Sequence, residues 1–538
     1  MISSQNFFAV VTPSIHRLVQ QYFCAHTHIY VLEHFLKNLF DMAETTIVWF
    51  RHDLRLDDNP SLARAASLGR VIPLFIWAPE EEDPWSPGAA SRWWLHGSLL
   101  QFQKQLAKLG APLVIRRGPS LDTLRSVAKA THATRIHWNR RHEPAVVERD
   151  TKIKATLTAD GIVTESFGGG LLYEPATLAT KEGKPYQVFT PFWRACLSKD
   201  EPALPLSAPR SLDSIPEALS TLSVESLRLL PSIDWAEQMR TQWTPGEAGA
   251  QARWNAFLTL PINDYGLERD RPDHRGTSSL SPHLHFGEIS PRRLWHSIRD
   301  MLGGISARCI TGGAEVFLRE IGWREFASHL LYHFPHTSDA PLRCSYENFP
   351  WRVDPVGLRA WQRGRTGFPI VDAGMRQLWQ TGWMHNRVRM IVASFLVKDL
   401  LVSWNDGARW FWDTLVDADL ASNTLGWQWA GGCGADAAPY FRVFNPTSQG
   451  NRFDPDGTYV RRFIPELHKL PTSSIHAPQQ ADAATLFAAE VRLGDNYPEP
   501  YVDHAEARLR ALSALKTVSQ KSPPPSTRVK KPSRRSPL

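Results

Sequence analysis

Along the first third of the chain, short apolar runs alternate with longer stretches in which apolar residues recur at helical spacing. The short runs predict buried strands at residues 46–50, 71–77, 112–116, 135–138 and 163–166. The stretches between them predict helices near residues 60–67, 91–109, 120–130 and 146–159. Strands separated by helices indicate βαβ units, so we expect an α/β domain with a doubly wound parallel sheet and right-handed crossovers. Such sheets bind ligands beyond the carboxyl ends of their strands.

The first predicted strand lacks the glycine-rich motif of dinucleotide-binding domains. No G-x-G-x-x-G follows residue 50, and the three glycines at 168–170 come after the fifth strand. We expect a turn at 168–170, and the first domain carries no dinucleotide signature.

The pattern changes after the fifth strand. Residues 175–245 are rich in Pro, Ser and Leu and predict a long connector. Beyond it no alternating strand pattern remains, and a serine followed by proline, at Ser281 and Ser290, predicts two helices with the serine as N-cap. We therefore expect residues 42–174 to form the α/β domain and residues 246–515 an all-helical domain.

The two ends of the chain differ from these domains. Residues 1–41 are apolar and aromatic without clear periodicity, whereas Met42 opens the orderly stretch that leads into the first strand. We expect Met42 to begin the working protein, with residues 1–41 untranslated or disordered. An organelle-targeting extension is the alternative, although Arg17 and Lys37 are the only Lys or Arg residues in that segment. Residues 516–538 are rich in Ser, Pro, Lys and Arg and predict a disordered tail.

Composition and charge limit the classes of function. The chain has 538 residues, 42% of them hydrophobic and 21% charged, which suits a globular protein of several domains. The formal net charge is +7, but residues 516–538 contain seven basic residues and no acidic one. The rest of the chain is neutral overall, so binding to a polyanion must depend on the local arrangement of charges.

The cysteines and the hydropathy favour a reducing compartment without membrane contact. Five cysteines form no C-x-x-C pair. No run approaches the roughly 18 apolar residues that a membrane-spanning helix needs. We expect a cytoplasmic protein.

Tryptophan is unusually frequent, with 21 residues against 11 tyrosines. Core packing accounts for most of them, but Trp427 and Trp429, two positions apart in a helical stretch, cannot share one apolar stripe. Asn423 and Trp427 share a helical face, and so do Glu320 and Trp323. A carboxylate or amide beside an indole suits a cavity for a flat polar ring better than a core.

Two polar segments of the helical region could also contact a ligand. Hydroxyl groups precede the predicted helix start at 281, namely those of Thr277, Ser278, Ser279 and Ser281. Hydroxyls, backbone amides and the helix dipole together suit a diphosphate, although an ordinary N-cap is the alternative. Asp417 and Asp419 lack a third ligand at metal spacing, so we expect no metal site and assign them as hydrogen-bond acceptors for a heterocycle or sugar.

Four longer motifs occur in order along the chain, namely WFRHDLRLDDN at 49–59, WREF at 323–326, GWMHNR at 382–387 and DADLASNTLGWQW at 417–429. Together they resemble the motifs of the DNA photolyase and cryptochrome family, most closely those of bacterial-type cyclobutane pyrimidine dimer photolyases. The resemblance covers residue 45 to about residue 510. It implies an α/β antenna domain, a connector, and a helical domain that holds a folded FAD in a pocket facing DNA.

The resemblance implies which residues bind the flavin. Those toward the diphosphate and the ribityl chain would be Tyr265, Thr277, Ser278, Ser279, Leu280 and Ser281. The loop against the flavin ring and the ribose would be Asp417, Ala418 and Asp419. Asn423 would lie beside N5, where an amide favours the reduced flavin. A relay of three tryptophans, Trp427, Trp404 and Trp351, would carry an electron from the surface to the excited flavin.

The resemblance also implies a surface that binds DNA and the lesion. The matching substrate contacts are Glu320, Trp323, Arg324, Asn386, Arg387, Met390, Trp429 and Gln449. Arg269 would contact a phosphate, with Arg442 nearby. Trp323 and Trp429 would stack beside a flipped dimer, and Glu320 would hydrogen-bond the thymine edge and stabilise developing charge.

The antenna pigment stays open. Relatives that bind a folate in the bacterial manner carry a Cys-Lys pair shortly after the WREF motif, and residues 335–339 lack it. Asn139 and Glu143 still resemble antenna contacts. Methenyltetrahydrofolate, a deazaflavin and no pigment remain the alternatives.

The resemblance therefore implies a monomeric light-driven lyase that acts on UV-damaged DNA. A cryptochrome, which senses light without repairing DNA, is the alternative, and the basic tail could serve either role. The complete set of lesion-contact residues favours repair. Relatives that repair (6-4) photoproducts carry histidines at the positions of Asn386 and Met390, so we expect cyclobutane dimers alone to be substrates.

Overall fold

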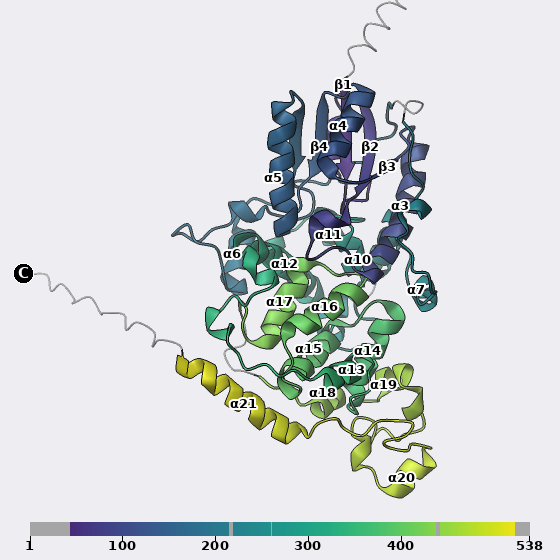
Figure 1. Cartoon of the computed structure of the whole chain (residues 1–538), viewed down its shortest axis with the longest axis vertical. Helices are drawn as coiled ribbons and strands as arrows, with labels where there is room; N and C mark the ends of the chain where they lie inside the picture. Colours follow the sequence, from purple (N-terminus) through teal and green to yellow (C-terminus); the bar gives the residue numbers. More distant parts are fainter. Residues whose placement is uncertain (1–43, 215–218, 260, 437–441, 522–538) are drawn as a thin grey trace, which may run out of the picture.

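The computed structural model of the protein describes residues 44–214, 219–259, 261–436 and 442–521 (Figure 1). An α/β domain lies at the top of the view, above a larger helical domain (Figure 1). The five strands of the α/β domain form one parallel sheet in the order β3-β2-β1-β4-β5. The predicted fold class is confirmed.

Each predicted strand is present, and its ends differ from the prediction by at most two residues. The strands are β1 Glu44–Phe50, β2 Gly69–Trp77, β3 Val114–Arg117, β4 Arg135–Asn139 and β5 Val163–Phe167. The helices between them are α2 Pro60–Ala66, α3 Ala89–Lys108, α4 Ser120–Thr131 and α5 Pro144–Ala159. Helix α2 begins where the Asn59 side chain accepts a hydrogen bond from the backbone N–H of Leu62 and Pro60 occupies the first turn.

Both faces of the sheet are buried, because successive residues of a strand point to opposite faces. On one face, Val48 and Phe50 of β1 pack with α2 and α3. On the other, Ile47 and Trp49 pack with α4 and α5. Burial on two sides explains why β1 and β2 appear in the sequence as unbroken apolar runs. The prediction of a buried strand at 163–166 is wrong in this respect, because β5 lies at the edge of the sheet and none of its residues is buried.

The strand order reverses between β1 and β4. The carboxyl ends of the strands face the helical domain (Figure 1). The contact is close at Gly287, whose backbone φ is +63°. A side chain at Gly287 would come within 2.3 Å of the His52 carbonyl oxygen. The residues that follow β1 are therefore fixed between the two domains at the position where doubly wound sheets bind ligands.

The helical domain contains α8 and the helices that follow it. They are α8 Glu247–Thr259, α9 Pro261–Glu268, α10 Ser281–His285, α11 Pro291–Met301, α12 Gly312–His333, α13 Pro355–Gln362, α14 Pro369–Thr381, α15 Asn386–Ser394, the π-helical turn η7 Phe395–Asp399, α16 Trp404–Thr414, α17 Leu420–Gly431, α18 Pro446–Phe453, α19 Thr458–Phe463, α20 Ala483–Ala488 and α21 His504–Lys521. Helix α17 contacts both α12 and α15.

The connector at 175–245 packs on both domains. It contains α6 Phe189–Ser198, which contacts α12, and α7 Glu237–Gln242, which contacts α14. Between these helices it lies along the edge strand β3, where the backbone N–H of Leu222 donates to the Ile115 carbonyl (3.1 Å). The Thr221 hydroxyl accepts from the Ile115 N–H (2.9 Å). The connector thus covers an edge that would otherwise present unpaired backbone groups.

One of the two predicted serine caps is present. The Ser290 side chain caps α11 by accepting from the backbone N–H of Arg293 (3.0 Å). The prediction for Ser281 is wrong, because the Leu280 carbonyl accepts the first helical hydrogen bond of α10, from Leu284 (2.9 Å), and Leu280 is the N-cap. The Ser281 hydroxyl instead accepts from the indole N–H of Trp383 (3.1 Å).

The C-terminal helix extends past the predicted domain end. Helix α21 continues to Lys521, so residues 516–521 are helical and the prediction that they belong to a disordered tail is wrong. Ala507, Ala511, Ala514 and Val518 recur at helical spacing and are buried, which gives this end of the chain an apolar face to pack. The predictions for residues 1–41 and 522–538 lie outside the described residues.

Among the described residues, no helix is both long and apolar enough to span a membrane.

Candidate active site

A cavity of about 570 Å³ lies in the helical domain, between α12, α15 and α17. Its volume is within the range of about 300–1,000 Å³ that is typical of small-molecule sites. The predicted site residues that line it are Tyr265, Arg269, Ser278, Leu280, Ser281, Glu320, Trp323, Arg324, Asn386, Arg387, Met390, Asp417, Ala418, Asp419, Asn423, Trp427 and Trp429. The fold thus brings residues from four separate sequence segments to one place.

Helix α17 forms one wall of the cavity. Asn423 and Trp427, one turn apart, both line it. The Asn423 amide nitrogen donates to the Ala408 carbonyl (3.0 Å), which orients the amide and leaves its oxygen to accept a further hydrogen bond. The Trp427 ring is buried against Gly407, where a side chain would approach the ring to 2.1 Å. The absence of a side chain at Gly407 leaves room for the indole beside α16.

Asp417 belongs to the loop that leads into α17. It is buried and accepts two hydrogen bonds from Nη2 of Arg389, at 2.8 and 3.1 Å. Arg389 in turn donates from Nε to the Met384 carbonyl (2.8 Å). These contacts fix the loop against α15.

Asp419 caps α17 by accepting from the backbone N–H of Ser422 (2.7 Å). Burial acts to raise the pKa of Asp419, but the nearby imidazole of His285, 4.0 Å away, and the charge of Arg324 outweigh it and hold that pKa well below its ordinary value. Asp419 therefore remains an anion at neutral pH, able to accept hydrogen bonds from a ligand.

Two consecutive residues after α9 form ion pairs at the cavity. The first of them, Arg269, contributes the cation, and the second, Asp270, contributes the anion. Arg269 donates from Nη1 to the Glu320 carboxylate (2.5 Å). Asp270 accepts from Nε and Nη2 of Arg387, at 3.2 and 2.8 Å. Burial and the charge of Glu320 raise the pKa of Tyr265 above its ordinary value, so the phenol beside Arg269 stays neutral.

The four hydroxyls predicted to bind a diphosphate are only partly brought to the cavity. Ser278 and Ser281 line it, whereas Thr277 and Ser279 are not among the described residues that do. Helix α10, at whose start they lie, has five residues. The helix is too short for a strong dipole, so side chains and backbone amides rather than the helix would have to bind a phosphate here.

Two tryptophans predicted to contact a base both line the cavity. Trp323 is stacked on Phe189, with ring centroids 3.8 Å apart and an interplanar angle of 7°. Phe189 covers one face of the indole, so a base can stack only on the other. Trp429 lies half-buried on α17.

The other two tryptophans of the predicted relay lie away from the cavity. Trp404 is buried at the start of α16, in the same apolar cluster as Trp427. Trp351 is half-buried, packs against that cluster, and lies 4.3 Å from Phe349 between ring centroids. The three indoles thus belong to one apolar region that runs from the cavity wall toward the surface.

Two predicted DNA contacts lie outside the described cavity lining. Gln449 is half-buried on α18, and Arg442 is exposed immediately after the undescribed residues 437–441. Their roles remain predictions.

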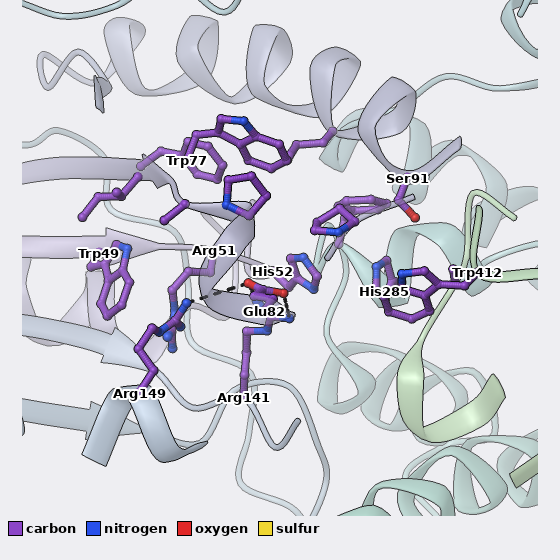
Figure 2. Close-up of a pocket in the computed structure, with 18 residues that line it drawn as sticks. Trp49, Arg51, His52, Trp77, Glu82, Ser91, Arg141, Arg149, His285 and Trp412 are labelled. Atoms are coloured by element: carbon purple, nitrogen blue, oxygen red, sulfur yellow. Dashed lines mark hydrogen bonds and ion pairs between the residues drawn. The ribbon is translucent and has the colours of Figure 1, made fainter. Parts of the chain in front are cut away.

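A second, small cavity lies at the carboxyl end of β1, between the two domains (Figure 2). Its volume is about 40 Å³, enough for a few water molecules and much less than a pigment needs. Figure 2 shows Arg141 and Arg149 pointing to Glu82, with Arg141 donating at 2.6 and 2.9 Å. His285 lines both cavities, so a single residue layer separates them.

The predicted antenna contacts lie beside the small cavity but are not among the described residues that line it. The Asn139 amide donates to Asp53 (2.7 Å) and Asn59 (2.8 Å), and its oxygen accepts from the N–H of Ser61 (3.3 Å). Glu143 forms an ion pair with Arg141 (2.9 Å). Both side chains stabilise the loops after β1 and β4, and their role toward a pigment remains a prediction.

The motifs alone did not identify several residues that shape the site. They are Asp270, His285 and Arg389. Asp270 and Arg389 are each adjacent to a predicted contact, but an ion pair between a helix and a distant loop has no local sequence signal. Across the part of the chain that the structure describes, no cluster of three or more His, Cys, Asp or Glu residues could hold a metal ion.

Known proteins are similar to this chain in both sequence and architecture. A family model described as DNA photolyase matches residues 46–210, and one described as the FAD binding domain of DNA photolyase matches residues 317–517. A deoxyribodipyrimidine photo-lyase from Agrobacterium fabrum is 48% identical over 476 residues, which cover 88% of this chain and 98% of that protein. Cryptochrome-1 of Arabidopsis thaliana is 42% identical over 88% of this chain and 70% of its own length.

Solved structures agree with the sequence matches. The crystal structure of a bacterial class III photolyase from Agrobacterium tumefaciens superposes with a TM-score of 0.85 at 47% sequence identity. The match covers 89% of this chain and 98% of that one. Both the α/β domain and the helical domain are therefore shared with these proteins.

Proposed function

Because the chain belongs to the DNA photolyase family, we propose that it is a light-driven deoxyribodipyrimidine photo-lyase that opens cyclobutane pyrimidine dimers in UV-damaged DNA. The observation that carries the proposal is one cavity lined by an oriented amide, Asn423, a carboxylate, Glu320, and the indoles of Trp323 and Trp429. A flat cofactor and a flipped pyrimidine dimer need this combination of groups.

The residues of the cavity fit FAD. The Asn423 oxygen can accept a hydrogen bond from a ring N–H, and Asp419 can accept bonds from a ribose or a ring. The residues that would hold the cofactor are Tyr265, Ser278, Leu280, Ser281, Asp417, Ala418, Asp419 and Asn423. When bound, reduced FAD supplies an electron on absorbing blue light, and the electron returns after the cyclobutane ring opens.

The chain's own aromatic residues bind the lesion in this proposal. Trp323, fixed by Phe189, and Trp429 offer indole faces to bases that have left the duplex. Each stacked base contributes roughly 1–3 kcal/mol, enough to offset part of the cost of unstacking the dimer.

Charged residues position the DNA and stabilise the reacting bases. Arg269 and Arg387 line the cavity and can hold phosphates. Glu320 hydrogen-bonds the pyrimidine edge and stabilises charge that develops in the dimer, the electrostatic effect that usually contributes most to catalysis. Glu320 is paired with Arg269 in the structure, so a lesion that enters the cavity has to compete with the arginine for this carboxylate.

The experiment that tests the proposal is loss of dimers from a defined oligonucleotide. Purified protein with reduced flavin, illuminated with blue light, should convert an oligonucleotide with one cyclobutane thymine dimer to the undamaged sequence. The same mixture kept in the dark should leave it unchanged. Persistence of the dimer under light, with the flavin bound and reduced, would overturn the proposal.

A second candidate function is light sensing without repair. The 42% identity with a plant cryptochrome favours it, because that match covers most of this chain. The two functions share the cavity and differ in the outcome of the same experiment. A protein that is photoreduced by light but leaves the dimer intact would support the sensing function.

We also propose an antenna pigment, methenyltetrahydrofolate or a deazaflavin. The small cavity beside Trp49 and Arg51 lies where doubly wound sheets bind ligands, and it would have to widen to hold such a pigment. Denaturing the purified protein should release a second chromophore in addition to the flavin. Release of flavin alone would exclude a bound antenna.

A further inference from the structure

The two residues after α9 connect three walls of the cavity. Arg269 forms an ion pair with Glu320 of α12, and Asp270 forms one with Arg387 of α15. A single turn of backbone therefore offers a cation to one helix and an anion to another. Of these four residues, Arg269, Glu320 and Arg387 are among the described residues that line the cavity, whereas Asp270 lies behind Arg387.

The guanidinium of Arg387 is held on three sides. Asp270 accepts two hydrogen bonds from it in a fork, a geometry that fixes both position and orientation. Phe453 lies under its plane, 4.5 Å from the ring centroid. The Met390 sulfur accepts a weak contact from Nη1 (3.7 Å). The Arg387 side chain is thus already ordered before any DNA binds.

We propose that Asp270 is a specificity-determining positioning residue that favours damaged over undamaged DNA. The inference rests on the proposed function and concerns the same site. Asp270 acts through Arg387, because it holds the guanidinium toward the cavity, where a flipped dimer presents its bases and its internal phosphate.

Asp270 affects the two kinds of DNA differently. Its negative charge repels the phosphates of any DNA, so it weakens binding of damaged and undamaged duplexes alike. Its ordering of Arg387 helps only a nucleotide that enters the cavity, since a stacked duplex does not reach that arginine's cavity side. The phosphate repulsion weakens binding of both kinds of DNA, whereas the ordering of Arg387 strengthens binding of damaged DNA alone. The ratio of damaged to undamaged affinity therefore increases.

The test compares Asp270→Asn, Asp270→Ser and Asp270→Glu with the wild-type protein. Binding to an oligonucleotide with one cyclobutane dimer and to its undamaged counterpart is measured in the dark with flavin bound. Asparagine removes the charge, and serine also removes the acceptor that could retain one hydrogen bond to Arg387. We expect both to lower the ratio of damaged to undamaged affinity by about three- to fivefold, the scale of one partly exposed ion pair. Glutamate, which keeps the charge and the fork, should retain most of the ratio.

Asp264→Asn serves as the matched control. Asp264 is an exposed carboxylate on α9, and its loss changes the net charge by the same amount. A general effect of charge should raise both affinities in this variant by equal factors and leave the ratio unchanged. Flavin content and melting temperature, measured for each variant, establish that the cavity is intact.

The outcomes separate this inference from the proposed function. A wild-type protein that binds both oligonucleotides equally overturns the proposed function and this inference with it. A wild-type protein that prefers the dimer, together with Asp270→Asn and Asp270→Ser variants that prefer it equally, overturns the role of Asp270 alone. A lower ratio in those two variants, with the ratio retained in Asp264→Asn, supports it.

Discussion

Asn386 and Met390 lie one turn apart on α15, and both line the cavity. Neither side chain can donate a proton as an acid. Opening a cyclobutane ring requires an electron and no obligatory proton donor, whereas repair of a (6-4) photoproduct requires proton transfer to the lesion. We expect the purified protein to leave a (6-4) thymine oligonucleotide unchanged under light. Repair of that substrate, beside a cyclobutane oligonucleotide treated identically, would contradict the assignment.

A substitution at Trp404 tests the predicted tryptophan relay. It is buried in the cluster that contains Trp427 and against which Trp351 packs. We expect Trp404→Phe to block photoreduction of the oxidised flavin, because phenylalanine is much harder to oxidise than indole, while repair by chemically reduced protein stays nearly intact. Flavin absorbance under illumination with an external reductant measures the first effect, and dimer loss measures the second.

Trp254 provides a control for the loss of a buried indole. It is fully buried in a different apolar cluster. Trp254→Phe should lower stability by a similar amount and leave photoreduction unchanged. Normal photoreduction in the Trp404 variant would remove that residue from the relay.

Among the helices, α12 connects the cavity to the segment that follows β5. Its residue Glu325 is buried and accepts the backbone N–H groups of Leu172 (2.9 Å) and Tyr173 (3.1 Å). Burial raises the pKa of Glu325 from 4.5 to about 7, against the charge of Arg324 and these two hydrogen bonds, which lower it. The neighbouring Arg324 donates to the Gly170 carbonyl (2.6 Å), so two consecutive residues attach this segment to α12.

The raised pKa predicts how stability depends on pH. As pH rises, the unfolded protein loses the Glu325 proton first, so the free energy of unfolding falls between about pH 4.5 and pH 7, by on the order of 3 kcal/mol. Glu325→Gln keeps one acceptor oxygen and does not titrate. Chemical denaturation at pH 5 and pH 8 should therefore show a smaller loss of stability in the variant than in the wild-type protein.

A substitution at an exposed carboxylate is the control for Glu325→Gln. Glu182 lies exposed in the connector, so Glu182→Gln should follow the wild-type pH dependence. An identical pH dependence in the wild-type protein and in Glu325→Gln would show that Glu325 is already ionised at pH 5.

The strands were predictable because both faces of the sheet are buried, which makes β1 and β2 stand out as unbroken apolar runs. The connector was harder, because its prolines suggest an extended chain and conceal α6, whose apolar face is visible only against α12. Ser281 shows another limit. The Leu280 backbone starts the helix one residue early, and no residue preference reveals such a shift.

The site also contains some features that the sequence predicts and others that depend on the tertiary structure. Residues within a continuous motif, such as Asn423 and Trp427 one turn apart, share a helical face by their spacing, and both line the cavity in the structure. The ion pair between Asp270 and Arg387 joins residues 117 positions apart, and it forms only because the turn after α9 lies close to α15 at the cavity. Pairings of this kind depend on the tertiary structure, and a single sequence does not specify them.

For the whole molecule, the distribution of charge predicts a salt effect. The last 17 residues contain Arg528, Lys530, Lys531, Arg534 and Arg535 and no acid. Deleting residues 522–538, which leaves α21 complete, should weaken binding to damaged and undamaged DNA by similar factors. Each phosphate that these side chains neutralise adds about 0.9 to the steepness of log affinity against log salt, so the truncated protein should show a shallower slope. Titrations at several salt concentrations measure it, and unchanged slopes would show that the tail does not bind DNA.

The strip of connector along β3 bears on how the protein folds during synthesis. The sheet obtains its last hydrogen bonds from Thr221 and Leu222, more than 50 residues after β5 ends. The loop after β1 depends on a residue still later in the chain, because the Glu247 carboxylate accepts hydrogen bonds from the backbone N–H groups of Leu56 (3.1 Å) and Asp57 (3.0 Å). A nascent chain that has just left the ribosome with its five strands therefore has an open edge and an unanchored loop. The first domain becomes complete only when the start of the second has emerged.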